Sequence, residues 1–357
     1  MNAPFRMQAS ATRLVDFAQP GEAARIERLV AAHPEGTPFH RPAWLLATAA
    51  GTGNKALALV EERSGEIVAL LPLLEVHSEL FGRVLVSSGF GVEGGVLAEV
   101  GAGGSLIPAA EELAQRRSCT TIELRGGLLP KARAGWQVRH DSHCGFVAEL
   151  AGDDEAQLLA IPRKQRAEVR KGLANQLTVS VGTSSEDRAA HYTVYAESVR
   201  NLGTPVFPNS LFDAVLDAFC EDADILTVRD GGVPVASVLS LYYRGAVMPY
   251  WGGGTHAARR LRANDRMYYE LMLHARRRGC ERFDFGRSKT GSGAHDFKKN
   301  WGFAPQPLGY ASYTVDGAEA RDADPTSAKH AARIALWRKL PLALSNRLGP
   351  LIARGLG

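Results

Sequence analysis

The chain has 357 residues, of which 45% are hydrophobic and 22% charged, an ordinary globular composition that is long enough for two domains of common size. The formal net charge of +4 is too small to indicate a nucleic-acid-binding protein by itself. The four cysteines form no C-x-x-C pair, which excludes the usual zinc and dithiol motifs and predicts reduced thiols at Cys119, Cys144, Cys220 and Cys280.

The amino-terminal segment predicts no export. Its first twenty residues contain no apolar core of the length that a secretory signal needs. The longest apolar stretch, Ile67–Val76, is interrupted by Pro72 and is about half the length needed to cross a bilayer, so we expect a buried strand there. These features predict a protein of the reducing cytoplasm.

Residues 1–150 predict a first α+β domain. Hydrophobic periodicity indicates helices at 22–32, near Trp44 and at 106–116. Two apolar runs between 56 and 76 flank the glycine of 63–66, which is the pattern of a β-hairpin. Further strands are expected at 84–87, 95–97, 120–124 and 146–150.

Residues 151–325 repeat this order of elements and predict a second domain. Helices around Val194–Val199 and at 211–219 precede two apolar runs, 225–229 and 235–243, which again form a hairpin pattern. The next elements are a strand at 247–251, a helix from Asn264 or Asp265 to just before Gly279, and a strand at 282–285. Such a β-α-β crossover implies two parallel neighbouring strands. The fold class is therefore α/β (α+β), with two diverged copies of one unit.

The segment IPRKQRAEVRKGL (Ile161–Leu173) carries positive charges at helical spacing. The basic residues are Arg163, Arg166 and Arg170, which share one side, and Lys164 and Lys171 nearby. Like charges at this spacing destabilise an isolated helix, so contact with a phosphate or a nucleic acid would relieve them. The alternative is a solvated face of a linker helix that Glu168 partly compensates.

The segment SVRNLGTPVFP (Ser198–Pro208) predicts a stiff polar loop. Pro205 and Pro208 fix their backbone angles, and Gly203 permits an unusual one. Such a loop suits substrate placement, which would use the side chains of Arg200, Asn201 and Thr204. The alternative is a connection between two helices that needs a firm turn.

The segment Tyr250–Tyr269 combines three adjacent glycines with aromatic and basic residues. A glycine loop between a strand and a helix lets backbone N–H groups approach an anion, and the positive end of the helix dipole adds to the attraction. The residues concerned are Tyr250, Trp251, Gly252, Gly253, Gly254, Arg259, Arg260 and Arg262. Their coincidence favours a ligand-binding role, whereas three glycines by themselves can also mark a β-bulge.

The segment FDFGRSKTGSGAHDFKKNWGF (Phe283–Phe303) is a dense group of polar residues. Its strand is expected to end at Gly286, so the loop after it lies beyond the carboxyl end of a parallel strand, where ligands collect in open α/β sheets. Arg287 and the lysines are suited to hold an oxyanion or a phosphate. The candidates for a general base that deprotonates an attacking amine are Asp284, His295 and Asp296. The alternative is that Asp296 caps a short helix and the lysines are solvated.

The carboxyl-terminal segment 327–357 is basic and amphipathic. It contains no acidic residue, and its composition predicts two short helices broken at Pro341. The basic residues are Lys329, Arg333, Arg338, Lys339, Arg347 and Arg354, and the apolar ones are Ile334, Leu336, Trp337, Leu340, Leu344, Leu348, Leu351 and Ile352. We expect peripheral contact with an anionic surface of the inner membrane through 327–354. Docking on the protein's own body is the alternative.

Four of these segments carry a resemblance to a known family. IPRKQRAEVRKG, SVRNLGTPVFP, NDRMYYELM and FDFGRSKTGSGAHDFKKNWGF resemble the FemAB-like proteins of the GNAT (N-acyltransferase) superfamily, closest to the subgroup found beside exosortase (PEP-CTERM) and exopolysaccharide genes. The resemblance extends from FHRPAW at Phe39 to the end of the chain. It implies two tandem GNAT-like domains, each a mixed central sheet flanked by helices, followed by the basic helices of 326–357.

The resemblance also implies an activity, the transfer of an acyl or aminoacyl group to an amine of a cell-envelope or exopolysaccharide precursor. FKKNWG is similar to the FKK-x-FG motif of the family, whose lysine lies near the acceptor, so Lys298 joins Asp284, Arg287, His295 and Asp296 in the expected catalytic set. The expected substrate-binding residues are Arg163, Lys164, Arg200, Asn201, Thr204, Tyr250, Trp251, Gly252, Gly253, Gly254, Asn264, Asp265, Tyr268, Ser288, Lys289, Gly291, Ser292, Lys299 and Trp301. No metal site is expected.

The donor and the acceptor stay open at this stage. The family implies acyl-CoA or aminoacyl-tRNA as a donor substrate, not a permanently bound cofactor. However, ARRLRAND (258–265) replaces the Q-x-x-G-x-G/A loop of acyl-CoA enzymes, and the coiled-coil arm of several tRNA-using members is missing. The acceptor would be a small molecule or a lipid-linked saccharide or peptide. Two alternative functions are a non-catalytic binding or scaffold protein of polysaccharide assembly and an acyl-CoA-dependent sugar N-acetyltransferase.

Overall fold

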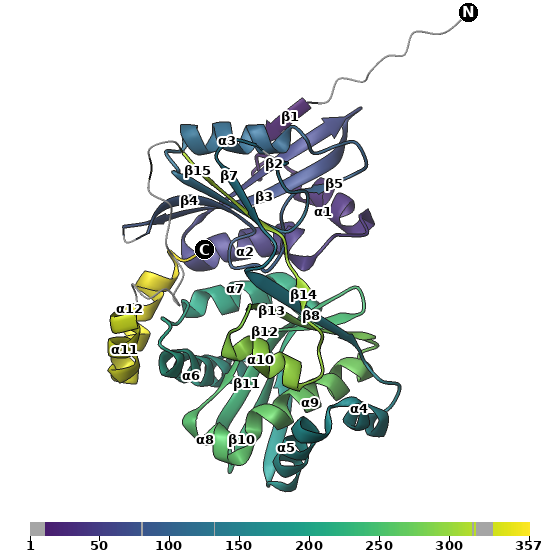
Figure 1. The fold of residues 1–357 in the computed structure, drawn as a ribbon, viewed down its shortest axis with the longest axis vertical. Coiled ribbons are helices and arrows are strands. Elements are labelled where there is room, and N and C mark those ends of the chain that lie inside the picture. The colour runs from purple at the N-terminus through teal and green to yellow at the C-terminus, as the bar shows by residue number, and fades with distance from the viewer. Residues whose placement is uncertain (1–10, 80, 132, 316–317, 319–330) are drawn as a thin grey trace, which may run out of the picture. The chain divides into compact units, whose positions relative to one another are not determined.

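The computed structural model describes residues 11–79, 81–131, 133–315, 318 and 331–357. These residues form two compact units, each with its own β-sheet (Figure 1). Among the described residues, those within 1–139, 309–322 and 355–357 belong to the first unit, and those within 140–308 and 323–354 belong to the second. The expected domain limit at 325 and the basic residue Lys329 lie outside the described residues. No described helix combines the length and the apolarity that crossing a bilayer requires.

The first unit is built around an eight-stranded mixed sheet. Its strands are β1 (Ala11–Leu14), β2 (Lys55–Arg63), β3 (Glu66–Ser78), β4 (Gly82–Ser87), β5 (Leu97–Ala98), β6 (Thr121–Arg125), β7 (Trp136–Arg139) and β15 (Tyr310–Thr314). They run in the order β1-β2-β3-β4-β6-β15-β7, with β5 beside β3. β4 and β6 are parallel, and the other ladders are antiparallel.

Helices cover both faces of this sheet (Figure 1). They are α1 (Glu22–Ala32), α2 (Pro42–Thr52), α3 (Leu106–Arg116) and the 3-10 helix η1 (Pro38–His40). α3 buries Leu106, Ala110 and Leu113, whose spacing puts them on one helical face, against the side of the sheet that carries Leu57 and Leu59. The intervening residues of β2 are also buried, so the sheet is a core with two covered faces.

Local sequence signals predicted most of the first unit. The helices at 22–32 and 106–116 are confirmed, and so is the hairpin of β2 and β3. Ser64 and Gly65 in its turn have φ angles of 54° and 84°, which two-residue hairpin turns of type I′ require. These elements depend on residues that are close in sequence, so the amino-acid pattern alone identifies them.

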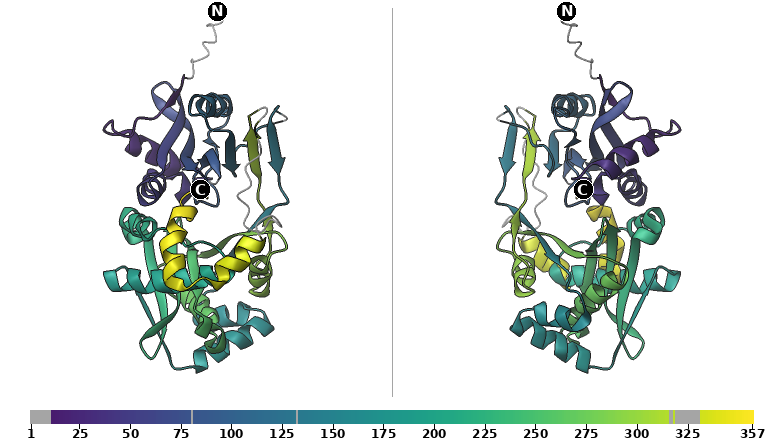
Figure 2. Two further views of the ribbon diagram at one scale, coloured as in Figure 1. Left: turned by 90° about the vertical axis from the view of Figure 1, so that its left-hand side faces the viewer. Right: turned by 90° about the vertical axis from the view of Figure 1, so that its right-hand side faces the viewer.

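The second unit contains a seven-stranded sheet in the order β14-β8-β13-β12-β11-β10-β9. The strands are β8 (His143–Glu149), β9 (Leu177–Gly182), β10 (Ala223–Asp230), β11 (Val233–Tyr243), β12 (Ala246–Gly254), β13 (Arg282–Lys289) and β14 (Gln306–Pro307). The helices are α4 (Asp154–Ala160), α5 (Arg163–Ala174), α6 (Ser185–Leu202), α7 (Asn209–Phe219), η2 (Cys220–Asp222), α8 (His256–Leu261), α9 (Ala263–Arg277), α10 (Gly293–Asn300), α11 (Ala331–Lys339) and α12 (Leu342–Ala353). α11 and α12 lie on the outside of this unit, against α6 (Figure 2).

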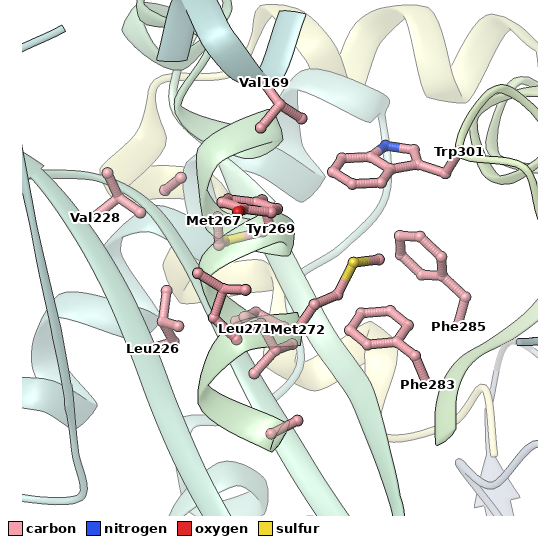
Figure 3. Packing of buried hydrophobic residues seen from close by; sticks show 14 of the residues in the cluster. Val169, Leu226, Val228, Met267, Tyr269, Leu271, Met272, Phe283, Phe285 and Trp301 are labelled. Atoms are coloured by element: carbon pink, nitrogen blue, oxygen red, sulfur yellow. The ribbon is translucent and has the colours of Figure 1, made fainter. Parts of the chain in front are cut away.

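The core of the second unit is organised around α9 (Figure 3). Met267 and Leu271 of α9 are fully buried and pack towards Leu226 of the sheet. On the other side of the helix, Phe283 and Trp301 belong to the same cluster. The predicted active segment is therefore attached to the main core of its domain by its large aromatic residues.

Two strands pair differently from the prediction. The strand expected at 146–150 in the first domain is β8, which pairs antiparallel with β13 in the second sheet. In the other direction, β15 lies within 151–325 but pairs with β6 and β7 of the first sheet. The prediction was wrong here because the order of elements along the chain does not reveal which distant strand satisfies the backbone hydrogen bonds of an edge.

The predicted β-α-β crossover is confirmed. β12 and β13 run parallel and pair at Ala246 with Arg282 and at Val247 with Phe283. Both strands then continue, to Gly254 and Lys289, without another ladder pair between them in the described structure. The two strands therefore diverge towards their carboxyl ends, which is where ligands bind in open α/β sheets.

The three adjacent glycines form the end of β12 and not a loop, which corrects the prediction. Gly252, Gly253 and Gly254 pair with Val238, Ser237 and Ala236 of β11. Two helices approach this strand too closely for side chains: a Cβ on Gly253 would lie 2.6 Å from the Cβ of Ser198, and one on Gly254 would lie 2.6 Å from the Cβ of Ala258. Gly253 and Gly254 therefore serve the packing of α6 and α8 on the strand.

We expect Gly253→Ala to destabilise the protein by about 1–3 kcal/mol, because the new methyl group must push α6 away from the sheet. Gly152→Ala is the matched control, since a Cβ there meets nothing within 4 Å. The measurement is chemical denaturation of both variants. Ser198→Gly should restore part of the stability of Gly253→Ala, and equal stability of the two glycine variants would contradict this account.

Candidate active site

The segment 283–303 is a strand, a tight turn and a helix, which corrects the expected long loop. β13 does not end at Gly286: this residue has a φ of 66° and sits in a bulge opposite β8, after which the strand resumes to Lys289. α10 then begins at Gly293, and its N-cap is Ser292, whose Oγ accepts a hydrogen bond from the His295 N–H at 3.2 Å. Ser292, and not Asp296, therefore caps the helix.

Lys298 is a buried amine at the end of α10. Its side chain is 9% exposed, and its Nζ donates a hydrogen bond to the carbonyl oxygen of Arg287 at 2.8 Å. The Nζ also lies 5.3 Å from the ring centroid of Phe146 and 5.6 Å from that of Phe285. Burial lowers the pKa of Lys298 from 10.5 to about 8, although the carboxylate of Asp284 opposes this change. Near neutral pH this amine can therefore both release and accept a proton.

Asp284 is an acidic neighbour of Lys298, and the two groups influence each other's pKa through their charges. It lies at the bulge of β13, where its Oδ1 accepts a hydrogen bond from the Gly286 N–H at 2.8 Å. Burial raises the pKa of Asp284, and this hydrogen bond together with the charge of Lys298 limits the increase. Opposite pKa shifts in two neighbouring groups are typical of sites that move protons.

The other two candidate bases, His295 and Asp296, occupy different environments. His295 is buried, and its ring meets that of Phe146 edge to face with centroids 5.6 Å apart. Asp296 is exposed, and its Oδ1 lies 3.3 Å from Nδ1 of His295. His295 and Lys298 are thus buried and Asp284 is half-buried, whereas Asp296 faces solvent.

Phe146 is the residue of this site that sequence reasoning missed. It is fully buried, and its ring contacts both Lys298 and His295. Its strand was assigned to the other sheet, so nothing connected it to the lysine. The alternation of Cys144, Phe146 and Ala148 was the signal that this strand has one face in a core.

A cleft of about 530 Å³ lies beside α10. It is lined by residues of α5, of α8 and α9, and of α10: Pro162, Lys164, Gln165, Glu168, Ala258, Arg259, Arg262, Asn264, Asp265, Phe297, Lys299 and Asn300. The structure therefore brings together four predicted binding residues, Lys164, Asn264, Asp265 and Lys299, which come from three separate segments of the sequence.

The charges and the helix at this cleft favour an anionic ligand. Four cations line it, from Lys164, Arg259, Arg262 and Lys299, against the two acids Glu168 and Asp265. Glu168 is paired, with Arg262 at 2.7 Å and Lys171 at 2.8 Å. The first turn of α9 also reaches the cleft, and the N-terminus of a helix attracts negative charge.

Two side chains at the start of α9 provide polar groups for orientation. The Gln165 amide donates to Asp265 Oδ1 at 2.6 Å, and burial raises the pKa of Asp265. Asn264 Oδ1 is buried and accepts no hydrogen bond within the described part of the chain. A ligand donor could therefore satisfy this oxygen.

The outer side of α5 has a second, shallower hollow of about 470 Å³, lined by Arg163, Arg166, Ala167 and Arg170. Its three arginines share one helical side, as the spacing predicted. Glu168 does not compensate them, because its carboxylate pairs with Lys171 and Arg262. Glu168 therefore does not neutralise the arginine side of α5, contrary to the alternative interpretation of this helix.

The segment 198–208 is explained by packing. Arg200 and Asn201 belong to the last turn of α6 and not to a loop, and Gly203 ends this helix with a φ of 86°. The Thr204 N–H donates to Val199 O at 2.9 Å, and Arg200 donates to Arg338 O at 3.3 Å. The alternative of a firm turn between helices therefore describes this segment.

The predicted aromatic residues split between the two faces of the sheet. Trp251 is buried against Phe212 of α7, with ring centroids 5.0 Å apart, and Tyr250 packs edge to face on Trp251. On the opposite face, Tyr268 contacts Phe285, Phe297 and Trp301, and burial raises the pKa of Tyr268 to about 12. Tyr268 and Trp301 thus pack on Phe285, whose ring lies 5.6 Å from Lys298 Nζ, whereas Tyr250 and Trp251 lie on the other face.

The remaining predicted residues surround the turn before α10. Ser288 is buried in β13, Lys289 is exposed at its end, and Gly291 has a φ of 74° in the turn.

No cluster of His, Cys, Asp and Glu side chains with the geometry of a metal site occurs among the described residues.

Comparisons with known proteins assign the fold. Residues 163–299 match the family model of an acetyltransferase (GNAT) domain. The solved structure of FemX is similar, with a TM-score of 0.65 and 16% identity over 85% of this chain and 98% of that chain. None of the curated proteins is significantly similar in sequence.

Two further solved structures have the same architecture. A tandem GNAT protein from the clavulanic acid biosynthesis pathway gives a TM-score of 0.57 with 11% identity, over 87% of this chain and 100% of that chain. L-PGS from Bacillus licheniformis gives 0.54 with 13% identity, over 89% and 96%. The predicted fold class, two GNAT-like units that each contain a mixed sheet and helices, is thereby confirmed. The matched domain contains Asp284, Lys298 and most of the cleft.

Proposed function

We propose that this GNAT-domain protein is an acyltransferase that moves an acyl or aminoacyl group from an activated donor to an amine. The observation that carries the proposal is the pair of half-buried Asp284 and buried Lys298, two groups with shifted pKa values beside the diverging strands β12 and β13. The GNAT domain matched over 163–299 supports a transferase. The cleft beside α10, in which cations outnumber acids, supports a nearby place for an anionic donor.

In the proposed reaction, the acceptor amine attacks the carbonyl carbon of the donor. A C–N bond forms, and the bond from this carbon to the sulfur of a thioester or the oxygen of an ester breaks. The neutral Lys298 amine takes the proton that the acceptor nitrogen loses, and the Lys298 ammonium then protonates the leaving group. The enzyme returns to its starting state without a covalent intermediate, and holding the two reactants together supplies the rest of the rate increase.

The cleft would hold the phosphate groups of the donor. Diphosphate in acyl-CoA and the phosphodiester end of an aminoacyl-tRNA share the chemistry that Arg259, Lys299 and the N-terminus of α9 recognise. The acceptor that we favour is an amine of a cell-envelope or exopolysaccharide precursor at the cytoplasmic face of the inner membrane, as in an exosortase-linked system. Incubation with acetyl-CoA or with aminoacyl-tRNA and amine-bearing precursors, followed by mass spectrometry, tests this function, and absence of any product with both donors would refute it.

Replacement of Arg259 and Lys299 by Gln is expected to weaken donor binding by about tenfold, because two charges that face the phosphates are removed. Calorimetric titration with CoA and with tRNA measures this effect. Arg277→Gln together with Lys55→Gln is the matched control, since both side chains are exposed, Arg277 at the far end of α9 and Lys55 in the first unit. Equal affinities of the double variant and the control for both ligands would mean that the cleft does not hold the donor.

A second candidate function is favoured by the arginine side of α5. Arg163, Arg166 and Arg170 face outward and suit a nucleic-acid backbone, as in a binding protein without catalysis. Binding to RNA that falls steeply with salt, without a transfer product, would select this function. Formation of an acylated product would exclude it as the sole activity.

A further inference from the structure

The two carboxyl-terminal helices are docked on the second unit, as the alternative interpretation of this segment expected. They flank Pro341, the residue at which the break was predicted. α12 buries Ser345, Gly349 and Ala353, which follow one another at intervals of four residues and form its inner side. A Cβ on Gly349 would lie 2.9 Å from the backbone nitrogen of Val206, so the helix meets the chain after α6 directly. Arg338 of α11 donates to Leu202 O at 3.1 Å.

The other side of these helices exposes leucines. Leu344, Leu348 and Leu351 of α12 are 42%, 38% and 60% exposed, and their spacing of four and three residues puts them on one face. Leu336 of α11 is 66% exposed. We call the three leucines of α12 the leucine face. Single exposed leucines are common on protein surfaces, but three in one row on a helix indicate a surface that another apolar phase covers.

Positive charges border the leucine face. Lys339 and Arg347 are exposed on the same two helices, and residues 331–357 include no acid. With 100° per residue, Arg347 lies about 40° from Leu351 around α12, on the side away from Leu348, so it stands at the edge of the leucine row. The surface therefore combines an apolar centre with a basic margin.

We propose that the leucine face docks on an anionic phospholipid bilayer. The leucines would enter the boundary of the acyl chains, and the cations would meet the phosphate groups, which is how interfacial helices bind. A second copy of the chain is a poorer partner, because an isologous contact through this face would bring the two sets of cations together. The proposed membrane contact is peripheral, because the inner sides of both helices pack on the second unit. This inference stands independently of the proposed acyl transfer.

Flotation of the full chain with lipid vesicles tests the proposal. The full chain is expected to float with vesicles of phosphatidylcholine and phosphatidylglycerol, and to float much less with phosphatidylcholine alone. The triple substitution Leu344→Glu, Leu348→Glu and Leu351→Glu should lower the bound fraction by roughly tenfold or more, because three apolar groups leave the lipid and three negative charges oppose it. These leucines are exposed, so the variant is expected to fold.

The matched control replaces three exposed residues elsewhere in the second unit: Val181→Glu, Leu159→Glu and Val233→Glu. Their side chains are 40%, 51% and 63% exposed, so this variant loses similar apolar area and gains the same charge. Equal loss of flotation in both triple variants, or no flotation of the unaltered chain, would overturn the proposal. So would a change from dimer to monomer in the leucine variant without vesicle binding, since the face would then join two copies. Melting temperatures of both variants check that the fold is kept.

Discussion

The Lys298→Met variant is expected to lose acyl transfer by about 10²- to 10⁴-fold while it keeps its fold, because a positioned acid–base group contributes this much. Methionine has a suitable length and polarity to occupy the site between the Phe146 and Phe285 rings. The loss would therefore reflect the missing amine and not a cavity. Single-turnover transfer at saturating donor measures the effect, and calorimetric titration shows whether the variant still binds the donor.

The pH dependence separates a proton-transfer role from a purely electrostatic one. If the neutral amine of Lys298 is the base, the rate rises with pH through about 8, where its pKa lies. Asp284→Asn removes the charge that raises the pKa of Lys298, so the midpoint should move to lower pH. Lys55→Met, at an exposed lysine of the first unit, is the control. Transfer by Lys298→Met within threefold of the unaltered protein would refute the assigned role.

Lys298→Met is also expected to stabilise the protein at pH 7, by about 3 kcal/mol, because burial lowers the pKa of the Lys298 ammonium from 10.5 to about 8. The unfolded chain binds the proton more tightly than the folded chain between these two pH values. The stability of the unaltered protein should therefore rise with pH from about 8 to about 10.5, where the lysine is neutral in both states. Below pH 8 the penalty is fully present.

Denaturation with urea at several pH values measures this effect as the difference between the unaltered protein and Lys298→Met. The effects of other titrating groups cancel in this difference. The difference should be largest at pH 7 and disappear towards pH 10.5. Lys55→Met should show no such trend, because Lys55 is exposed. If Lys298→Met is less stable than the unaltered protein at every pH, Lys298 stabilises the fold.

Elements defined by neighbouring residues were predictable from the sequence. The limits of α1 and α3 follow from the spacing of their apolar residues, and the β12–α9–β13 crossover follows from helix and strand patterns in the right order. The resemblance pointed to Lys298. Its burial was not predictable, because the ring that covers it, Phe146, comes from a strand about 150 residues earlier in the sequence.

The three glycines of β12 show why composition alone was insufficient. A glycine cluster after a strand has the same local pattern whether it leaves room for a ligand or for a helix. Here Ser198 and Ala258 occupy the space, and these residues belong to helices on opposite sides of the cluster in sequence. The distinction depends on how helices pack, and this is decided by contacts between residues far apart in the chain.

The position of β15 has a consequence for how the protein is made. This strand joins β6 to β7, yet it begins at Tyr310, about 170 residues after β7 ends. During synthesis, β6 and β7 therefore lack their partner strand until most of the chain has left the ribosome. Synthesis adds about 5–20 residues per second. During this interval of roughly ten seconds or more, the exposed backbone of β6 would be a target for chaperones and for aggregation.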